Sequence, residues 1–300
     1  MYFFGIGAMI LVGICWTIYG YVMGKAPKEN IRISCLMILS AFLAGLVSLV
    51  IGMVQGFPQT DNRFLLLALG SQFACGIINY VQLDLMSRAM QKGPNGLVWG
   101  IMQSGLIGTF LMGVIFFGEK PAPVRVIGLF LILGGVLAMG LAKDDRSAST
   151  GKSWVLFSLG ALALSMVTQC CNALPSYFQE MSKNDAASRT LGLYFGGVIG
   201  FALTTLPGMI RKRDFGGRGE WGSAIVLVMT NTAASLFFFF RGLDHLARIG
   251  CAGLGYPIAI GACVIGFSLY SLLILKEKFP RISLLGLGVV CIGIIVISLK

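Results

Sequence analysis

The chain has 300 residues, of which 56% are apolar and only 12% charged, and its mean hydropathy is +0.85. A water-soluble domain could not hide this much apolar surface, so the composition excludes a soluble fold and indicates a protein that lies in lipid. The net charge of +11 comes from basic residues scattered through short loops. Orientation in a bilayer explains this charge better than binding to nucleic acid, so no nucleic-acid partner is expected.

A membrane-spanning helix needs about 20 apolar residues, and ten segments of the sequence meet this requirement. They are Phe3–Met23, Ile33–Gln55, Phe64–Asp84, Pro94–Gly118, Val124–Ala142, Trp154–Phe178, Leu191–Ile210, Trp221–Phe240, Gly250–Leu275 and Ile282–Leu299. The first lacks the basic flank and the cleavage site of a signal peptide, so we expect it to be retained. The sequence thus predicts an all-α polytopic membrane protein with ten transmembrane helices.

The first and third segments carry aromatic, polar and charged residues that are candidates for a functional site. Trp16 and Tyr19 belong either to an interfacial aromatic belt or to the wall of a cavity. Asn79 needs a partner inside the membrane, which makes it a candidate to bind solute. Asp84 is expected to be the deepest acidic residue, and Arg88 lies on the same helix face. The two form either an ion pair near the cytoplasmic end of the helix or a gate in which Asp84 binds a proton.

The fourth and ninth segments each contain an aromatic residue followed by a residue that weakens or breaks a helix. The pairs are Trp99 with Gly100, and Tyr256 with Pro257. Interrupted helices at corresponding positions of two halves indicate the binding site of a transporter. We therefore predict that Trp99 and Tyr256 approach the midplane of the membrane from opposite faces. The alternative is that Gly100 and Pro257 only kink two packed helices.

The sixth and eighth segments again combine polar residues with charged or helix-breaking ones. Gln169 and Asn172 precede Pro175, which can free a backbone carbonyl inside the membrane. The eighth segment carries Asn231 and is followed by Arg241. These residues join the candidates for a polar site within the membrane.

The stretch from Gly93 to Ala142 is written a second time from Gly250 to Leu299. Corresponding pairs are Gly96 with Gly253, Glu119 with Glu277, Gly128 with Gly286, and Gly135 with Gly293; the same alignment pairs Asp84 with Arg241. Since five helices in each half is an odd number, the halves must be inverted across the membrane. We predict a first five-helix repeat over residues 1–142, a linker over 143–152, and a second repeat over 153–300.

The duplicated glutamate motif carries a family resemblance. Two five-helix halves, GEK at Gly118–Lys120 and KEK at Lys276–Lys278 resemble the drug/metabolite transporter superfamily in its ten-helix, EamA-like form. The segment GIINY at Gly76–Tyr80 is similar to the rhamnose and glucose/ribose sugar uptake permeases. The resemblance implies an inverted-repeat secondary transporter with a central cavity. Many members of the larger branch are exporters whose termini are read as cytoplasmic.

Charge in the connections indicates orientation. Most of the 23 lysines and arginines fall in alternate connections, including the linker at residues 143–152. The positive-inside rule then places the linker in the cytoplasm and both termini outside it, in a multi-pass protein of the cell (inner) membrane. This orientation departs from that of the exporters and favours the uptake branch.

No motif indicates an enzyme or a cofactor. H-E-x-x-H and G-x-S-x-G are absent, as is the G-x-x-x-x-G-K-[ST] motif of ATP use. The eight cysteines contain no C-x-x-C pair and His245 is the single histidine, so no metal site is expected. A membrane receptor or structural subunit that does not transport is the alternative from another class.

The predicted function is secondary transport of a small polar metabolite, such as a sugar, by alternating access. We place the cavity between Trp99 and Tyr256, because aromatic faces can cover the apolar faces of a solute while a few amides fix its polar groups. The amide candidates are Asn79, Gln103, Gln169, Asn172 and Asn231. Protons are the expected coupling ion, with Asp84, Arg88 and Arg241 as coupling or gate residues. The alternative within the superfamily is an exporter of a metabolite or an amino acid.

Overall fold

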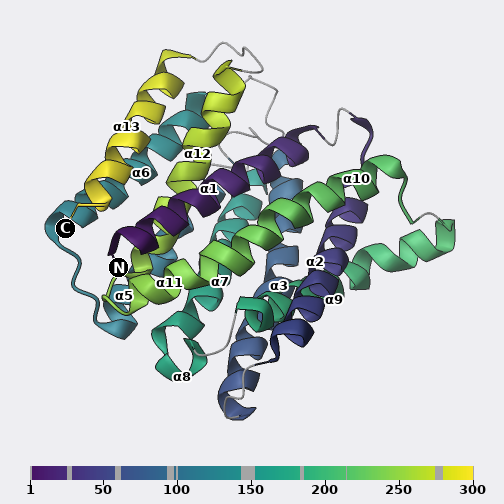
Figure 1. Ribbon diagram of the computed structural model, residues 1–300. Helices are drawn as coiled ribbons and strands as arrows, with labels where there is room; N and C mark the ends of the chain where they lie inside the picture. The colour runs from purple at the N-terminus through teal and green to yellow at the C-terminus, as the bar shows by residue number, and fades with distance from the viewer. Residues whose placement is uncertain are drawn as a thin grey trace.

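A computed structural model describes residues 2–25, 29–57, 62–92, 98, 101–142, 153–182, 186–213, 215–273 and 280–299. Throughout these ranges the regular structure is helical, and no strand occurs in them (Figure 1). Trp99, Gly100 and Glu277, which the sequence pattern singles out, lie outside the described residues.

Within the described ranges, seven helices are long and apolar enough to cross a membrane, and three shorter apolar helices accompany them. The single-helix spans are α1 (Tyr2–Lys25), α2 (Ile33–Gln55), α3 (Asn62–Lys92), α5 (Leu106–Phe117), α6 (Pro123–Ala142), α7 (Ser153–Tyr177), α9 (Ala186–Lys212), α12 (Gly255–Leu273) and α13 (Arg281–Ile297). The remaining span is composite: α10 (Arg218–Leu227), the π-helical η2 (Val228–Thr232) and η3 (Ser235–Phe239), and α11 (Phe240–Ala247). Each predicted apolar segment overlaps one of these spans, so the prediction of an all-α polytopic membrane protein is confirmed.

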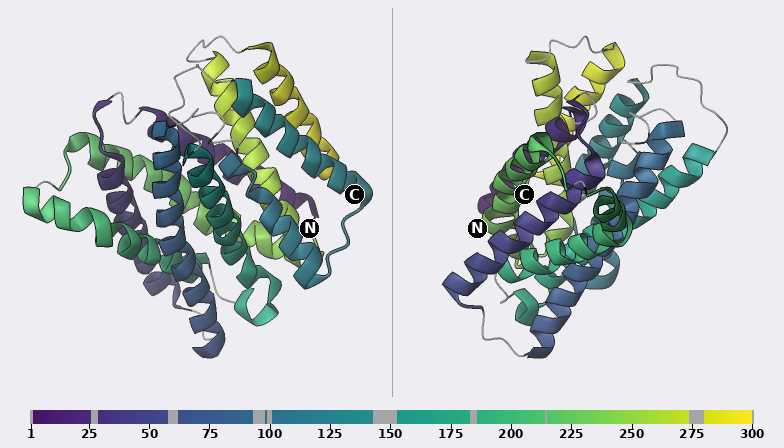
Figure 2. Two further views of the ribbon diagram at one scale, coloured as in Figure 1. Left: turned by 180° about the vertical axis from the view of Figure 1, so that it is seen from behind. Right: turned by 90° about the vertical axis from the view of Figure 1, so that its right-hand side faces the viewer.

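Both chain termini lie at the same end of the bundle (Figures 1 and 2). We call this the terminal end; it also holds the short helix α8 (Gln179–Ser182) and the 3₁₀ turn η4 (Ala252–Leu254) that precedes α12. The opposite end is where α1 and α3 finish and α2 and α10 begin.

The buried apolar core differs between the two ends. One continuous cluster fills the terminal end and draws on α1, α5, α6, α7, α11, α12 and α13; its members include Met9, Leu106, Phe110, Leu243 and Ile258. The opposite end holds two smaller clusters instead. One contains Leu36, Phe201 and Leu227, and the other contains Met86, Met102 and Ala161.

Glycines let α6 and α13 pack with their backbones in near contact. A Cβ added to Gly135 would lie 2.6 Å from the carbonyl oxygen of Gly286, and one added to Gly128 would lie 2.9 Å from that of Gly293. Neither position can therefore hold a larger residue without a shift of the backbone. Small residues have this role between membrane helices, where close packing replaces the hydrophobic effect.

Candidate functional site

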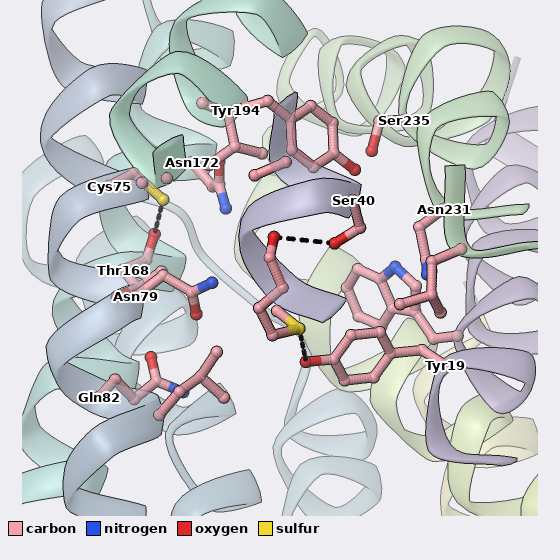
Figure 3. Close-up of a pocket in the computed structure, with 18 of the residues that line it drawn as sticks. Tyr19, Ser40, Cys75, Asn79, Gln82, Thr168, Asn172, Tyr194, Asn231 and Ser235 are labelled. Carbon is pink, nitrogen blue, oxygen red and sulfur yellow. Dashed lines mark hydrogen bonds between the residues drawn. The ribbon is translucent and has the colours of Figure 1, made fainter. Parts of the chain in front are cut away.

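A cavity of about 300 Å³ lies inside the bundle (Figure 3). Its wall includes residues of α1, α2, α3, α7, α9, η2, η3 and α12. Figure 3 shows Asn79 and Asn172 on one wall, with Tyr19 and Asn231 on the facing wall. None of the described residues that line the cavity is charged.

The predicted solute-binding residues gather around this cavity. Its lining contains Asn79, Gln103, Gln169, Asn172, Asn231 and Tyr256. The predicted Trp99 and its neighbour Gly100 lie outside the described residues. The sequence therefore indicated side chains that the fold brings together, while their role in binding stays a prediction.

Several residues of the cavity wall carry a buried oxygen atom that has no hydrogen-bond partner among the described residues. They are the amide oxygens of Gln82, Gln169, Asn172 and Asn231 and the hydroxyl oxygen of Thr168. Buried polar atoms are stable only when water or a ligand satisfies them. The amides of this wall can bond a polar solute once their oxygen atoms turn toward the cavity.

Three aromatic rings form an apolar part of the same wall. The ring centroid of Trp16 lies 6.0 Å from that of Tyr256 and 5.9 Å from that of Phe239. The Tyr256 and Phe239 rings meet edge to face at 5.5 Å. Trp16 and Tyr19 thus line the cavity, which decides between the two positions that the sequence left open for them.

The π-helical turns η2 and η3 interrupt the eighth span where it borders the cavity. They carry Asn231, Thr232 and Ser235, all of which line it, and the Tyr194 hydroxyl faces the last two. Wide turns of this kind often mark functional sites. The polar residues were visible in the sequence, but nothing in the sequence predicted the π-helical geometry or the participation of Tyr194.

Pro175 lies inside α7, and its effect on the backbone is visible. A proline gives no amide hydrogen to the carbonyl four residues earlier, which is that of Cys171. The side-chain amide of Gln72 in α3 donates to this oxygen at 3.2 Å and to the Asn172 carbonyl oxygen at 3.3 Å. The third and sixth spans are thus joined beside the cavity.

The interruption of the ninth span is not where we predicted it. Pro257 falls in the first turn of α12, where a missing amide hydrogen leaves no helical carbonyl unpaired. The irregular part is the preceding η4 turn. In the fourth span, a turn at Ser104 and Gly105 precedes α5, with the Gly105 amide donating to the Met102 carbonyl at 3.0 Å.

Asp84 and Arg88 form the ion pair that was one of the two alternatives. Arg88 Nε lies 2.8 Å from Asp84 Oδ2, and the side chains are 57% and 38% exposed. Neither residue is among those that line the cavity. The expectation that Asp84 is the deepest acidic residue was wrong, because Glu119 and Glu220 are only 9% and 7% exposed. Helix α3 extends to Lys92 and carries Asp84 toward the bundle surface.

A buried ion pair at the terminal end was missed by the sequence analysis. Arg189 of α9 is fully buried, and its Nη1 lies 2.9 Å from Oδ1 of Asp244 in α11. The same side chain donates to Ser176 Oγ and to the carbonyl oxygen of Met181 at 3.3 Å each. These contacts tie α7, α8, α9 and α11 together. The predicted gate residue Arg241 is also in α11 but is exposed.

The first half of the chain matches a known family of proteins. Residues 3–141 match the EamA-like transporter family. The resemblance to the drug/metabolite transporter superfamily is thereby confirmed. The EamA-like match and the apolar helices together identify a multi-pass membrane protein.

Curated relatives of this chain carry the name guanidinium exporter. That of Yersinia pseudotuberculosis is 32% identical over 59 residues, which are 19% of this chain and 57% of the relative. The one from Salmonella typhimurium is 30% identical over 63 residues, 21% of this chain and 60% of the relative. The Proteus vulgaris protein is 33% identical over 63 residues, which are 21% of this chain and 61% of the relative. The chain thus spans 57% to 61% of the length of these relatives.

One solved structure, described only as "Crystal structure of protein", shares the architecture over nearly the whole chain. Its TM-score is 0.69, and the match covers 97% of this chain and 95% of the other at 13% identity. At this identity the match shows the fold alone.

Proposed function

We propose that the chain is a secondary transporter that carries a small, uncharged polar solute across the cell (inner) membrane by alternating access. The observation that carries this proposal is the cavity itself, which is walled by helices of both halves and offers amides and aromatic rings. A volume of about 300 Å³ is at the lower end of the range for small-molecule sites. The EamA-like match and the relatives named exporters support transport as the general activity.

The lining favours a neutral solute with several hydrogen-bond donors. The buried amide oxygens of Gln82 and Asn231, which have no partner among the described residues, can accept from hydroxyl groups after a side-chain rotation. The rings of Trp16 and Tyr256 can cover an apolar face. A sugar or another polyol has this combination. The relatives' name also supports export of a nitrogen-rich cation as a second candidate, but no carboxylate is among the described residues of the wall to pair with one.

Helix packing supports two inverted repeats over residues 1–142 and 153–300, joined by the 143–152 linker. The fifth and tenth spans pack on each other, as do the second and seventh. Contact of the third span with the sixth is matched by contact of the eighth with the first. The two glycine contacts are related in the same way, because exchanging the halves converts the contact of Gly128 with Gly293 into the contact of Gly286 with Gly135. Exchanging the halves therefore converts each of these contacts into itself or into another of them.

The unequal cores support alternating access between the two ends. A continuous cluster closes the terminal end, whereas the opposite end holds two smaller clusters, around Leu36 and Met102, that are connected through the partly buried Leu83. Transport then requires the terminal end to separate while the opposite clusters come together. In the orientation that the basic residues favour, the terminal end faces the exterior.

Coupling to protons is part of the proposal, but the geometry offers little support for Asp84 as the coupling carboxylate. Its partner Arg88 holds it at a partly exposed position outside the cavity. We retain Asp84, Arg88 and Arg241 as gate candidates at the two ends.

A thermal-shift screen of purified protein tests the proposal. Neutral polyols, amino acids and small cations are compared, and we expect at least one neutral polar class to raise the unfolding temperature. Tyr256→Ala and Asn231→Leu should lose that shift, while Ser71→Ala, which lies outside the cavity, should keep it. Stabilisation by cations alone, with no neutral class active, would overturn the assigned solute class.

A further inference from the structure

Glu119 is a carboxylate held at the terminal end in a slot that glycines keep open. It follows α5 through Gly118, whose φ of 64° makes the turn, and its amide donates to the Gly113 carbonyl oxygen at 2.9 Å. A Cβ on Gly113 would collide with the carboxylate, and one on Gly253 would lie 2.9 Å from its Oε2. Only 9% of the residue is exposed. The glutamate of the GEK motif at Gly118–Lys120 is therefore the residue that fills this slot.

The carboxylate connects the first half of the chain to the cavity wall of the second. The Gly253 amide donates to Oε2 at 3.3 Å and to Oε1 at 3.4 Å. Gly253 lies in η4, and the next helical turn carries Tyr256, whose ring lines the cavity. Movement of Glu119 away from η4 would thus release the start of α12 and the ring that it positions.

The groups that face Glu119 come from each element packed around it. They are the Tyr177 hydroxyl of α7, the Arg125 guanidinium of α6, and the amides of Ala252 and Gly253. Arg125 also donates to the Cys251 thiol, with Nη1 2.9 Å from Sγ. Burial raises the pKa of the Glu119 carboxyl, and these donors and the positive charge of Arg125 offset that rise only in part.

A buried carboxyl of this kind binds its proton more tightly when the slot is closed than when water fills it. Proton binding therefore favours the closed arrangement, and loss of the proton favours separation of Glu119 from η4. We propose that Glu119 is a proton-binding site that controls opening of the terminal end, which stays closed while the proton is bound. This inference rests on the proposed transport function, because opening of that end is a step of alternating access.

Proton binding is tested first by infrared difference spectroscopy of the purified protein during a pH titration. We expect a protonated-carboxyl band whose midpoint lies above the ordinary range of glutamate, and we expect Glu119→Gln to abolish it. Glu220→Gln is the matched control, because Glu220 is also buried and also accepts from a helix-start amide, that of Gly217 at 2.9 Å, but at the opposite end. The band should persist in this control; a band that survives Glu119→Gln overturns the assignment.

Opening is tested by hydrogen exchange of the peptide that contains Gly253. After correction for the intrinsic pH dependence of exchange, the wild type should lose protection as pH rises through the infrared midpoint. Glu119→Gln, which is neutral at every pH, should stay protected throughout. Equal loss of protection in both proteins contradicts control by Glu119.

A second variant covers the case in which Glu119→Gln does not fold. Tyr177→Phe removes a hydroxyl that favours the ionised carboxylate, so the infrared midpoint should move to higher pH. An unchanged midpoint means that another group titrates. None of these measurements uses a solute, so their failure leaves the proposed function standing. If instead no solute is transported in vesicles, the titration still reports on Glu119 by itself.

Discussion

The side-chain amide of Gln72 donates a hydrogen bond of 3.2 Å to the carbonyl oxygen of Cys171, the carbonyl that Pro175 deprives of its helical donor. Gln72 is fully buried, so water cannot replace it without rearrangement. A side chain of α3 therefore supplies the hydrogen bond that Pro175 removes from α7, next to Asn172 in the cavity wall.

Replacing Gln72 with leucine should destabilise the protein by about 1–3 kcal/mol, because it leaves a buried carbonyl without a donor. Thermal unfolding in detergent measures the effect. Ser71→Ala is the neighbouring control, since Ser71 bonds only locally to the Ala68 carbonyl and should change stability little. Equal stability of Gln72→Leu and the wild type would show that the bond contributes nothing to the fold.

The contact between α6 and α13 yields a second prediction. Gly135→Val should force the two backbones apart and cost about 1–3 kcal/mol of unfolding free energy. The adjacent Gly134 is an internal control, because nothing lies within 4 Å of a Cβ placed there. Gly134→Val should therefore be tolerated. If chemical unfolding finds the two variants equally stable, the close approach of Gly135 to Gly286 is not a constraint.

These elements show how much of the fold could be predicted from sequence. The ten apolar segments and the effect of Pro175 follow from rules that depend on nearby residues, so they could be predicted. The repeat alignment pairs Gly135 with Gly293, but it did not show that Gly135 packs against Gly286.

The parts that could not be predicted depend on partners that are distant in the chain. Arg189 stands in a polar stretch that resembles a loop, and only the fold brings it to Asp244. Asp84 looked deep because it ends an apolar run, yet α3 continues beyond it and exposes it. The cavity amides were found because amides are rare in apolar segments, whereas Tyr194 gave no comparable signal.

The buried pair of Arg189 and Asp244 should be needed for the folded state. Asp244→Asn leaves the fully buried guanidinium without its counter-charge and should cost about 3–5 kcal/mol, or prevent folding. The exposed pair at the opposite end provides the comparison, because Arg88→Ala should cost less than about 1 kcal/mol. A small effect of Asp244→Asn on the unfolding midpoint would mean that the carboxylate charge is dispensable there.

Stability should depend on pH through Glu119. At low pH the wild type and Glu119→Gln both hold a neutral group in the slot and should unfold at similar temperatures. As pH rises through the raised pKa of the folded state, the wild type must bury a charge and should lose stability relative to the variant. Unfolding temperatures of both proteins across this range give the difference. A difference that is constant with pH, or that changes in the opposite direction, would contradict a pKa raised by burial.

The most direct test of the proposed function is counterflow in vesicles that contain the purified protein. Vesicles loaded with an unlabelled neutral polar solute should accumulate the labelled solute transiently, and Asn231→Leu should abolish this while still folding. Ser71→Ala, which lies outside the cavity and is not a gate candidate, should retain it. If no neutral polar solute shows counterflow, although the protein is folded and inserted, or if the cavity variant transports as well as the wild type, the central cavity is not the path of a transported solute.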